Sequence, residues 1–249
     1  MITVESLASS SNGNLYRITS GRHQLLLEAG LPIGEIKKRL CYQLSRLDGC
    51  FITHEHGDHS TGARRLADAG VQLYMTLGTA KALKFDYYKP AEELAGGGHV
   101  GIVSAEEGTV TLKNFWHVTP FKVIHDAAEP VGYMIADGYG DTLVFATDTY
   151  VIPVKFKKIN VLMIECNYAP GIVQKRLEEG SISRKQADRL LHSHMSIGSV
   201  VSFLRANEEA LKACRQIYLL HGSAQNGNPE LFKYTVQGLT GIPTVVCER

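Results

Sequence analysis

Residues 51–62 read FITHEHGDHSTG and carry the strongest signal in this chain. Three histidines and an aspartate stand close together in it: His54, His56, Asp58 and His59. They follow the apolar run 50–52, where a buried strand would end in a loop, and Gly57 lets the backbone turn tightly. Imidazole nitrogens and a carboxylate suit a borderline divalent ion such as zinc. The alternative, a loop merely rich in histidine, is disfavoured because clustered imidazoles would repel one another on protonation.

Length and composition predict a single globular domain spanning 1–249. The chain has 44% hydrophobic residues and a net charge of +1, with 26 basic against 25 acidic side chains. This balance disfavours a strongly electrostatic nucleic-acid binder. Five widely spaced cysteines without a CxxC pair indicate no disulfide framework and fit a reducing cytoplasm. We expect no export signal, because the N-terminus lacks a basic region followed by a long apolar one, and no membrane anchor.

The order of apolar runs predicts an α/β fold. Three hairpin-connected strands come first, at 2–7, 14–18 and 23–28, joined by the turn-rich segments SSSNGN and TSGR. Strands and helices then alternate: helix 34–45, strand 49–53, helix 62–69 capped by Ser60 or Thr61, strand 71–75, and a short helix from Thr79.

A second block of strands follows. Residues 85–98 are an irregular excursion, and 99–148 form an antiparallel block of strands. The last third predicts a strand at 160–165, a helical stretch at 171–191, a helix at 196–207, a strand at 216–220, a helix at 229–238 and a strand at 243–247. Two strand-rich blocks, each followed by helices, predict a four-layer αββα sandwich with mixed sheets and helices on both outer faces.

Three further candidate ligands stand at ends of predicted strands: His125, Asp148 and His221. Each follows a buried run, so all three could project from the same edge of the sheets toward the 51–62 loop. Taken alone, a strand-end aspartate is often a turn former and a single histidine is often merely hydrogen-bonded. The recurrence at equivalent points favours one site.

The chain resembles the metallo-β-lactamase-fold hydrolases over nearly its whole length. The motifs that carry the resemblance are LLLEAG (25–30), THEHGDH (53–59), HDAAEPVGYMI (125–135), ATDT (146–149) and LLHGS (219–223). The DH pair at 58–59 and the HDA…GY segment look like the phosphodiesterase branch that includes ribonuclease Z and the WalJ/YycJ-type nucleases. FATDTYVI…MIECNY and SHMSIGSVVSFL look like a phage and Firmicute group that includes the anti-Pycsar enzymes, which hydrolyse cyclic mononucleotides.

This resemblance implies two divalent metal ions, Zn²⁺ in the first place, with Mn²⁺ or iron as alternatives. It assigns His54, His56 and His125 to one ion. It assigns Asp58, His59 and His221 to the other, with Asp148 bridging the two. Two such ions activate water and stabilise the charge of a phosphoryl transition state. Asp58 would orient the attacking water.

His194 is the predicted general acid. It stands where the related phosphodiesterases carry a histidine that assists the leaving group, and a near-neutral imidazole suits that task. A surface histidine at a helix end is the alternative, and His192 is the second candidate. Glu28 replaces the aspartate of the family's DAG motif and is expected to accept a hydrogen bond from a ligand histidine.

Weaker signals concern substrate contacts. Ser11 and Asn12 could donate to a phosphate, although a plain hairpin turn is the more ordinary interpretation. Tyr87 and Tyr88 could stack on a base or meet a partner subunit.

Three functions fit the sequence: a phosphodiesterase for small 3′,5′-cyclic mononucleotides, a WalJ/YycJ-type exonuclease, and a metal-holding binding protein without catalysis. The first is favoured by the neutral charge, and the third is disfavoured by the complete ligand set with His194. A cytoplasmic homodimer, phage-encoded and acting in the host, is the expectation that accompanies the first.

Overall fold

The computed structural model describes residues 1–91, 100–106 and 108–247, and the chain divides into two compact units. The first comprises Met1–Phe121 and Ala127–Thr142, and the second comprises Lys122–Asp126 and Leu143–Glu248. The organisation of 1–249 as one domain stays a prediction.

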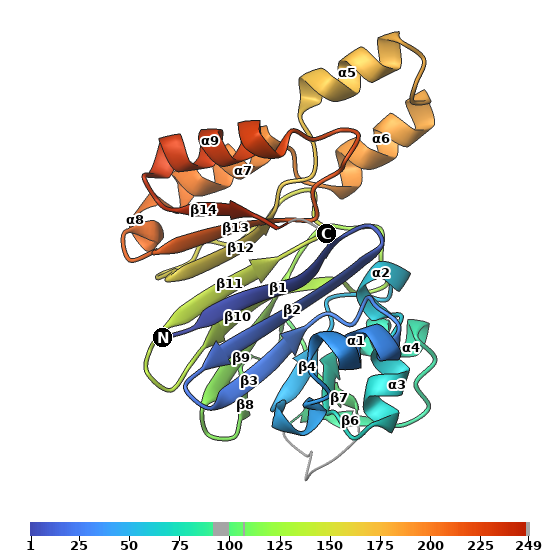
Figure 1. The fold of residues 1–249 in the computed structure, drawn as a ribbon, viewed down its shortest axis with the longest axis vertical. Helices are drawn as coiled ribbons and strands as arrows, with labels where there is room; N and C mark the ends of the chain where they lie inside the picture. Colours follow the sequence, from blue (N-terminus) through green and yellow to red (C-terminus); the bar gives the residue numbers. More distant parts are fainter. Residues whose placement is uncertain (92–99, 107, 248–249) are drawn as a thin grey trace. The chain divides into compact units, whose positions relative to one another are not determined.

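The first sheet has seven strands in the order β1-β2-β3-β4-β5-β7-β6 (Figure 1). Their bounds are β1 Thr3–Ser10, β2 Gly13–Ser20, β3 His23–Leu27, β4 Gly49–Phe51, β5 Leu73–Met75, β6 Tyr88–Pro90 and β7 Val100–Ile102. The first three are antiparallel hairpin partners, as predicted, and β3, β4, β5, β7 and β6 run parallel.

Three expectations about these strands are wrong. Strand β1 continues through Ser9 and Ser10, which pair with Asn14 and Gly13, so most of the SSSNGN segment is strand and not turn. Strand β7 was expected in the antiparallel block, but it pairs in parallel with β5 and β6 in the first sheet. Strand β6 itself lies within the segment expected to be irregular, because parallel pairing with β7 supplies its backbone partners.

Helices of the first unit pack on this sheet. They are α1 Ile33–Arg39, the 3-10 turn η1 Leu44–Arg46, α2 Gly57–Ser60, α3 Ala63–Asp68 and α4 Leu77–Ala82. Their apolar side chains, such as Ile36, Leu66 and Ala80, join Leu26 and Leu73 of the strands in one buried cluster. Burial of this apolar surface is the main force that holds helices and sheet together.

Two predicted helix boundaries are wrong. The helix predicted at 34–45 ends at Arg39, because Cys41 and Tyr42 adopt left-handed backbone conformations with φ of 49° and 61°. Neither Ser60 nor Thr61 caps α3. Their hydroxyls donate to the backbone carbonyls of residues 55–57, and Gly62 is the residue that precedes α3 as its N-cap.

The second sheet has the order β14-β13-β12-β11-β10-β9-β8. Its bounds are β8 Val110–Leu112, β9 Trp116–Lys122, β10 Val131–Ala136, β11 Thr142–Ala146, β12 Val161–Glu165, β13 Gln216–Leu220 and β14 Thr244–Val246. The pairs β11–β12, β12–β13 and β13–β14 are parallel, whereas β8 and β9 are antiparallel. Strand β12 is buried along its whole length, as expected for a parallel strand covered on both faces.

The remaining helices belong to the second unit: α5 Pro170–Glu178, α6 Arg184–Ser193, α7 Ile197–Ala206, α8 Glu208–Leu211 and α9 Pro229–Thr240. The helical stretch predicted at 171–191 is two helices, because Gly180 is left-handed at φ 68° and Ser183 caps α6 with a capping box. In Figure 1, α7 and α9 lie beside β13 and β14. No helix in the described part of the chain is long and apolar enough to cross a bilayer.

Candidate metal centre

The loop after β4 gathers three imidazole rings in the first unit. The His54 ring centroid lies 4.6 Å from that of His56 and 4.3 Å from that of His59. His54 and His59 are fully buried. The short helix α2 begins after His56 and carries Asp58 and His59, whose Nε2 lies 3.4 Å from Asp58 Oδ2. Strand β4 ends at Phe51, two residues before the predicted end at 53, and the ligand-type side chains follow it.

Glu28 lies beneath this loop, at the end of β3. Its Oε1 accepts a 2.6 Å hydrogen bond from the Thr53 hydroxyl and lies 3.5 Å from His59 Nδ1. The same hydroxyl lies 2.9 Å from His54 Nδ1, so one carboxylate orients two histidines. Burial raises the pKa of Glu28 above its ordinary value, and the contacts with His59 and Thr53 offset part of that rise.

Asn14 of β2 supports the loop from the other side. Its Nδ2 donates to the Asp58 carbonyl at 3.2 Å and lies 3.2 Å from His59 Nε2. Gly30 lies against the same part of the loop, next to Asn14 and the Asp58 carbonyl. A Cβ on Gly30 would stand 1.7 Å from the Asp58 carbonyl oxygen, so only glycine fits between β2 and the loop.

The second unit brings together the three strand-end ligands predicted from the sequence. His221 Nδ1 lies 3.2 Å from Asp148 Oδ1, and His125 Nε2 lies 3.7 Å from Asp148 Oδ2. His125 Nδ1 lies 3.0 Å from the carbonyl oxygen of Ser193, which fixes the ring orientation. Burial lowers the pKa of His125, and Asp148 counteracts part of that effect. A neutral imidazole is the form that binds metals.

Glu165 and His194 complete this group. His194 follows α6, and its Nδ1 lies 2.6 Å from Glu165 Oε1. Its ring is stacked with that of His221 at 5.5 Å. Burial lowers the pKa of His194, but the carboxylates of Glu165 and Asp148 together raise it, so the net shift is upward. Burial raises the pKa of Glu165, and His194 and His221 lower it by more, so the carboxylate stays ionised beside them.

Three site residues share an uncommon backbone conformation. Glu28, Asp148 and His221 follow strands β3, β11 and β13 within two residues, and their φ angles are 67°, 45° and 51°. Left-handed backbone is unfavourable for side chains of this kind and concentrates at functional sites. The turn re-aims each side chain at the point where its strand ends.

These donor sets fit divalent metal ions. Asp148, Glu165, His194 and His221 each place one ligand-type atom so that all lie within 4.8 Å of one another. The first unit adds three clustered imidazoles and the Asp58 carboxylate. Nitrogen and oxygen donors of this kind suit zinc, manganese or iron, and a cation would stabilise so many buried carboxylates and imidazoles.

The weaker sequence candidates lie elsewhere. Ser11 and Asn12 form the exposed turn between β1 and β2, and the Asn12 N–H donates to Ser10 Oγ. Tyr88 packs against the buried cluster of the first unit, whereas the Tyr87 side chain is exposed with Lys89 Nζ 5.9 Å from its ring. In α6, exposed His192 Nδ1 lies 2.7 Å from the carbonyl oxygen of Asp188.

Sequence reasoning missed several supporting groups: Asn14, Thr53, Glu165 and Asn167. Glu165 ends the buried run 160–165, the same signal that singled out Asp148, so that criterion applied consistently would have found it. Asn167 donates to the His221 carbonyl at 2.8 Å, a contact that no spacing in the chain reveals.

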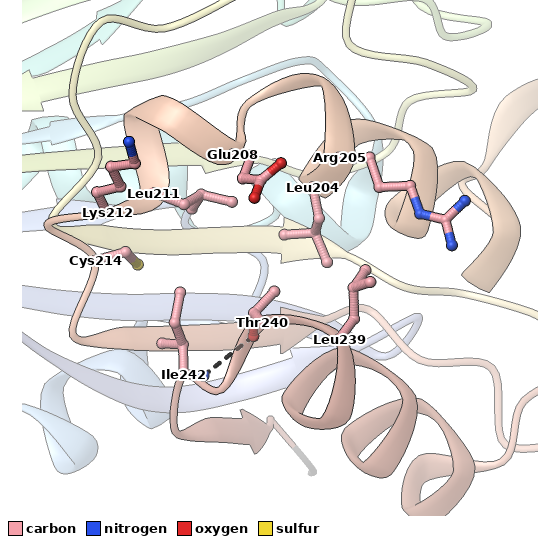
Figure 2. Close-up of a pocket in the computed structure, with 9 residues that line it drawn as sticks. All are labelled: Leu204, Arg205, Glu208, Leu211, Lys212, Cys214, Leu239, Thr240 and Ile242. Carbon is pink, nitrogen blue, oxygen red and sulfur yellow. Dashed lines mark hydrogen bonds between the residues drawn. The ribbon is translucent and has the colours of Figure 1, made fainter.

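The described part of the second unit includes two hollows near its helices. The larger, of about 630 Å³, lies between α7, α8 and α9 (Figure 2). The described residues that line it are four aliphatic side chains, a cysteine, a threonine and three charged side chains, among them one carboxylate, Glu208, and no histidine. It is therefore not the metal site. The other hollow, of about 440 Å³, begins at Tyr150, two residues beyond Asp148.

Comparison with known proteins places these features among related sequences and folds. Residues 23–221 match the beta-lactamase superfamily domain. Exodeoxyribonuclease WalJ of Streptococcus pneumoniae is 28% identical, with 92% of this chain and 85% of that protein covered. The metallo-beta-lactamase fold protein YhfI from Bacillus subtilis superposes with a TM-score of 0.71 at 16% identity, covering 99% of this chain and 96% of that one. The short form of human tRNase Z superposes with a TM-score of 0.62 at 16% identity, covering 100% of this chain and 96% of that one. These likenesses confirm the predicted fold class.

Proposed function

Because the chain belongs to the beta-lactamase superfamily, we propose that it is a dinuclear metal-dependent phosphodiesterase that hydrolyses a nucleotide phosphodiester. The observation that carries this proposal is that the metal-type donors Asp148 and His221 lie beside a carboxylate-bound histidine, His194, whose Nδ1 lies 2.6 Å from Glu165 Oε1. A purely structural zinc site has a closed set of ligands and needs no such histidine.

In this proposal His54, His56 and His125 would hold one ion. Asp58, His59 and His221 would hold the second, and Asp148 would be shared between the two. When bound, the ions supply a neutral-pH nucleophile from water and stabilise negative charge on the phosphoryl group.

The protein groups orient the reactants. Asp58 accepts a hydrogen bond from the attacking water and aims it at phosphorus. His194 donates a proton to the departing oxygen. The Glu165 carboxylate raises the pKa of His194, which favours the protonated ring, and it lies on the Nδ1 side, so Nε2 is the atom that would deliver the proton.

The substrate proposed first is a 3′,5′-cyclic mononucleotide. A net charge of +1 from nearly equal numbers of basic and acidic residues suits a ligand with one phosphate. The FATDTYVI…MIECNY and SHMSIGSVVSFL segments resemble the anti-Pycsar group, so we also propose a phage-type counter-defence role in a host cytoplasm. A homodimer belongs to the same proposal.

Exonucleolytic cleavage of DNA is the second candidate. It is favoured by the likeness to WalJ, a protein named as an exodeoxyribonuclease, over 92% of this chain. Both candidates use the same bond-breaking chemistry and differ in the size of the substrate.

The test is a direct assay of products. Metal-loaded protein is incubated with each 3′,5′-cyclic mononucleotide and, separately, with single- and double-stranded DNA and RNA, and products are separated by chromatography. We expect linear mononucleotides from the cyclic substrates. Cleavage of polymers alone would select the exonuclease, and cleavage of neither would overturn the phosphodiesterase proposal.

A pair of variants ties the activity to the site. His56→Ala should abolish turnover while the protein still folds, because His56 is only partly buried. The matched control is His117→Ala, which removes an exposed histidine of β9 and should leave turnover unchanged.

A further inference from the structure

The smaller hollow of the second unit has two distinct walls. One is the irregular segment from Tyr150 to Lys155, and the other is a face of α7. The helix contributes residues spaced as one helical face: Ser199, Ser202, Phe203 and Ala206. Its volume of about 440 Å³ lies within the usual range of small-ligand pockets.

One buried carboxylate, that of Glu165, hydrogen-bonds both to residues at the hollow and to the ligand cluster. Glu165 Oε2 accepts hydrogen bonds from the backbone N–H of Thr149 at 3.0 Å and of Met195 at 3.1 Å, while Oε1 faces His194. Thr149 directly precedes Tyr150, and Met195 itself lines the hollow. Each wall of the hollow therefore begins next to a backbone N–H that donates to Glu165, the carboxylate that contacts the proposed general acid His194.

The chemistry of the lining suits a flat heteroaromatic ring. Tyr150 is 44% exposed and Val151 is 38% exposed, so apolar and aromatic surface faces solvent here. The His192 ring lies 6.3 Å from the Tyr150 ring at an interplanar angle of 24°, which extends the aromatic surface. The Ser202 hydroxyl donates to the Gly198 carbonyl at 3.0 Å, and the Ser199 hydroxyl lies 3.0 Å from that of Ser196. The oxygen of Ser202 therefore remains as an acceptor beside the hollow.

We propose that this hollow binds the nucleobase of the substrate, with Tyr150 as the stacking platform and the α7 hydroxyls contacting the base edge. The inference rests on the proposed phosphodiesterase function. Base–aromatic stacking tolerates any base, whereas hydroxyls next to the base edge provide selectivity. Tyr150 is a binding residue in this scheme and takes no part in bond breaking.

The experiment compares two phosphodiesters. One is the nucleotide that the protein turns over, a 3′,5′-cyclic mononucleotide or a DNA dinucleotide. The other is methyl 4-nitrophenyl phosphate, which has no nucleobase. Tyr150→Ala should raise KM for the nucleotide roughly five-fold or more, the lower end of base-stacking effects, and leave kcat/KM for the base-free diester unchanged. Tyr150→Phe, which keeps the ring, should restore the nucleotide KM.

Two additional variants make the result decisive. Ala206→Trp fills the hollow from an exposed position of α7 and should raise the nucleotide KM even if Tyr150→Ala folds poorly. Tyr234→Ala removes a tyrosine of α9 that is 71% exposed and does not line the hollow. This variant should leave KM for the nucleotide and kcat/KM for the base-free diester unchanged.

The possible outcomes separate the two proposals. If wild-type protein cleaves both diesters and the pocket variants affect them equally or not at all, the nucleobase assignment is wrong and the phosphodiesterase proposal stands. If wild-type protein cleaves neither diester, the phosphodiesterase proposal fails and the nucleobase assignment fails with it.

Discussion

Glu165 joins three parts of the second unit, because its two oxygens contact His194, the Thr149 N–H and the Met195 N–H. Glu165→Gln keeps the side-chain volume but removes the charge that raises the His194 pKa. We expect turnover to fall roughly 10–100-fold, the usual effect of losing a group that orients site residues. Steady-state kinetics alongside thermal unfolding measures it. Wild-type turnover in a folded Glu165→Gln protein would contradict the assigned role.

Tyr74 gives a prediction about alkaline stability. Burial, and secondarily the charge of Asp48, raises the Tyr74 pKa to about 12, whereas an unfolded tyrosine ionises near pH 10. The contribution of the protonated Tyr74 to the free energy of unfolding is therefore complete below about pH 10. It is lost as the pH rises toward about 12, since the ionised form favours the unfolded chain.

Urea unfolding at a series of pH values tests this linkage. Tyr74→Phe keeps the stacking on Phe51, whose ring centroid lies 4.7 Å away. The variant should lose roughly 2 kcal/mol less stability than wild type across that pH window, because one pKa unit corresponds to about 1.4 kcal/mol. Parallel stability curves for the two proteins would show that Tyr74 ionises alike in both states.

Among the secondary-structure elements, Gly30 follows β3 and lies against the 51–62 loop. We therefore expect substitution of this glycine to lower both activity and stability. A Cβ at position 30 would overlap the Asp58 carbonyl, so Gly30→Ala should displace the loop, abolish turnover and destabilise the first unit by several kcal/mol, as overpacking does. Gly34→Ala is the matched control. That position in α1 has nothing within 4 Å of an added Cβ, and alanine should stabilise the helix by up to about 1 kcal/mol.

Local hydrophobic patterns predicted most of the helices and strands, because a buried strand or an amphipathic helix can be recognised from a short stretch of sequence. The failures depend on partners distant in sequence. Strand β6 exists through its pairing with β7, and Ser9 and Ser10 are strand because β2 pairs with them. The same holds in the site. His54 and Asp148 follow recognisable strand ends, whereas Asn14 reaches His59 from another strand of the fold.

At the scale of the whole molecule, charge balance predicts how binding responds to salt. With 26 basic and 25 acidic residues, the chain has little excess charge for neutralising a polyphosphate backbone. For a cyclic mononucleotide with one phosphate, KM should rise only about three-fold or less between roughly 50 and 200 mM salt, whereas a protein contacting six to ten DNA phosphates loses about 10³–10⁵ in affinity. Initial rates over a salt series measure this slope. A steep slope would place several phosphates on the protein and select the exonuclease as its activity.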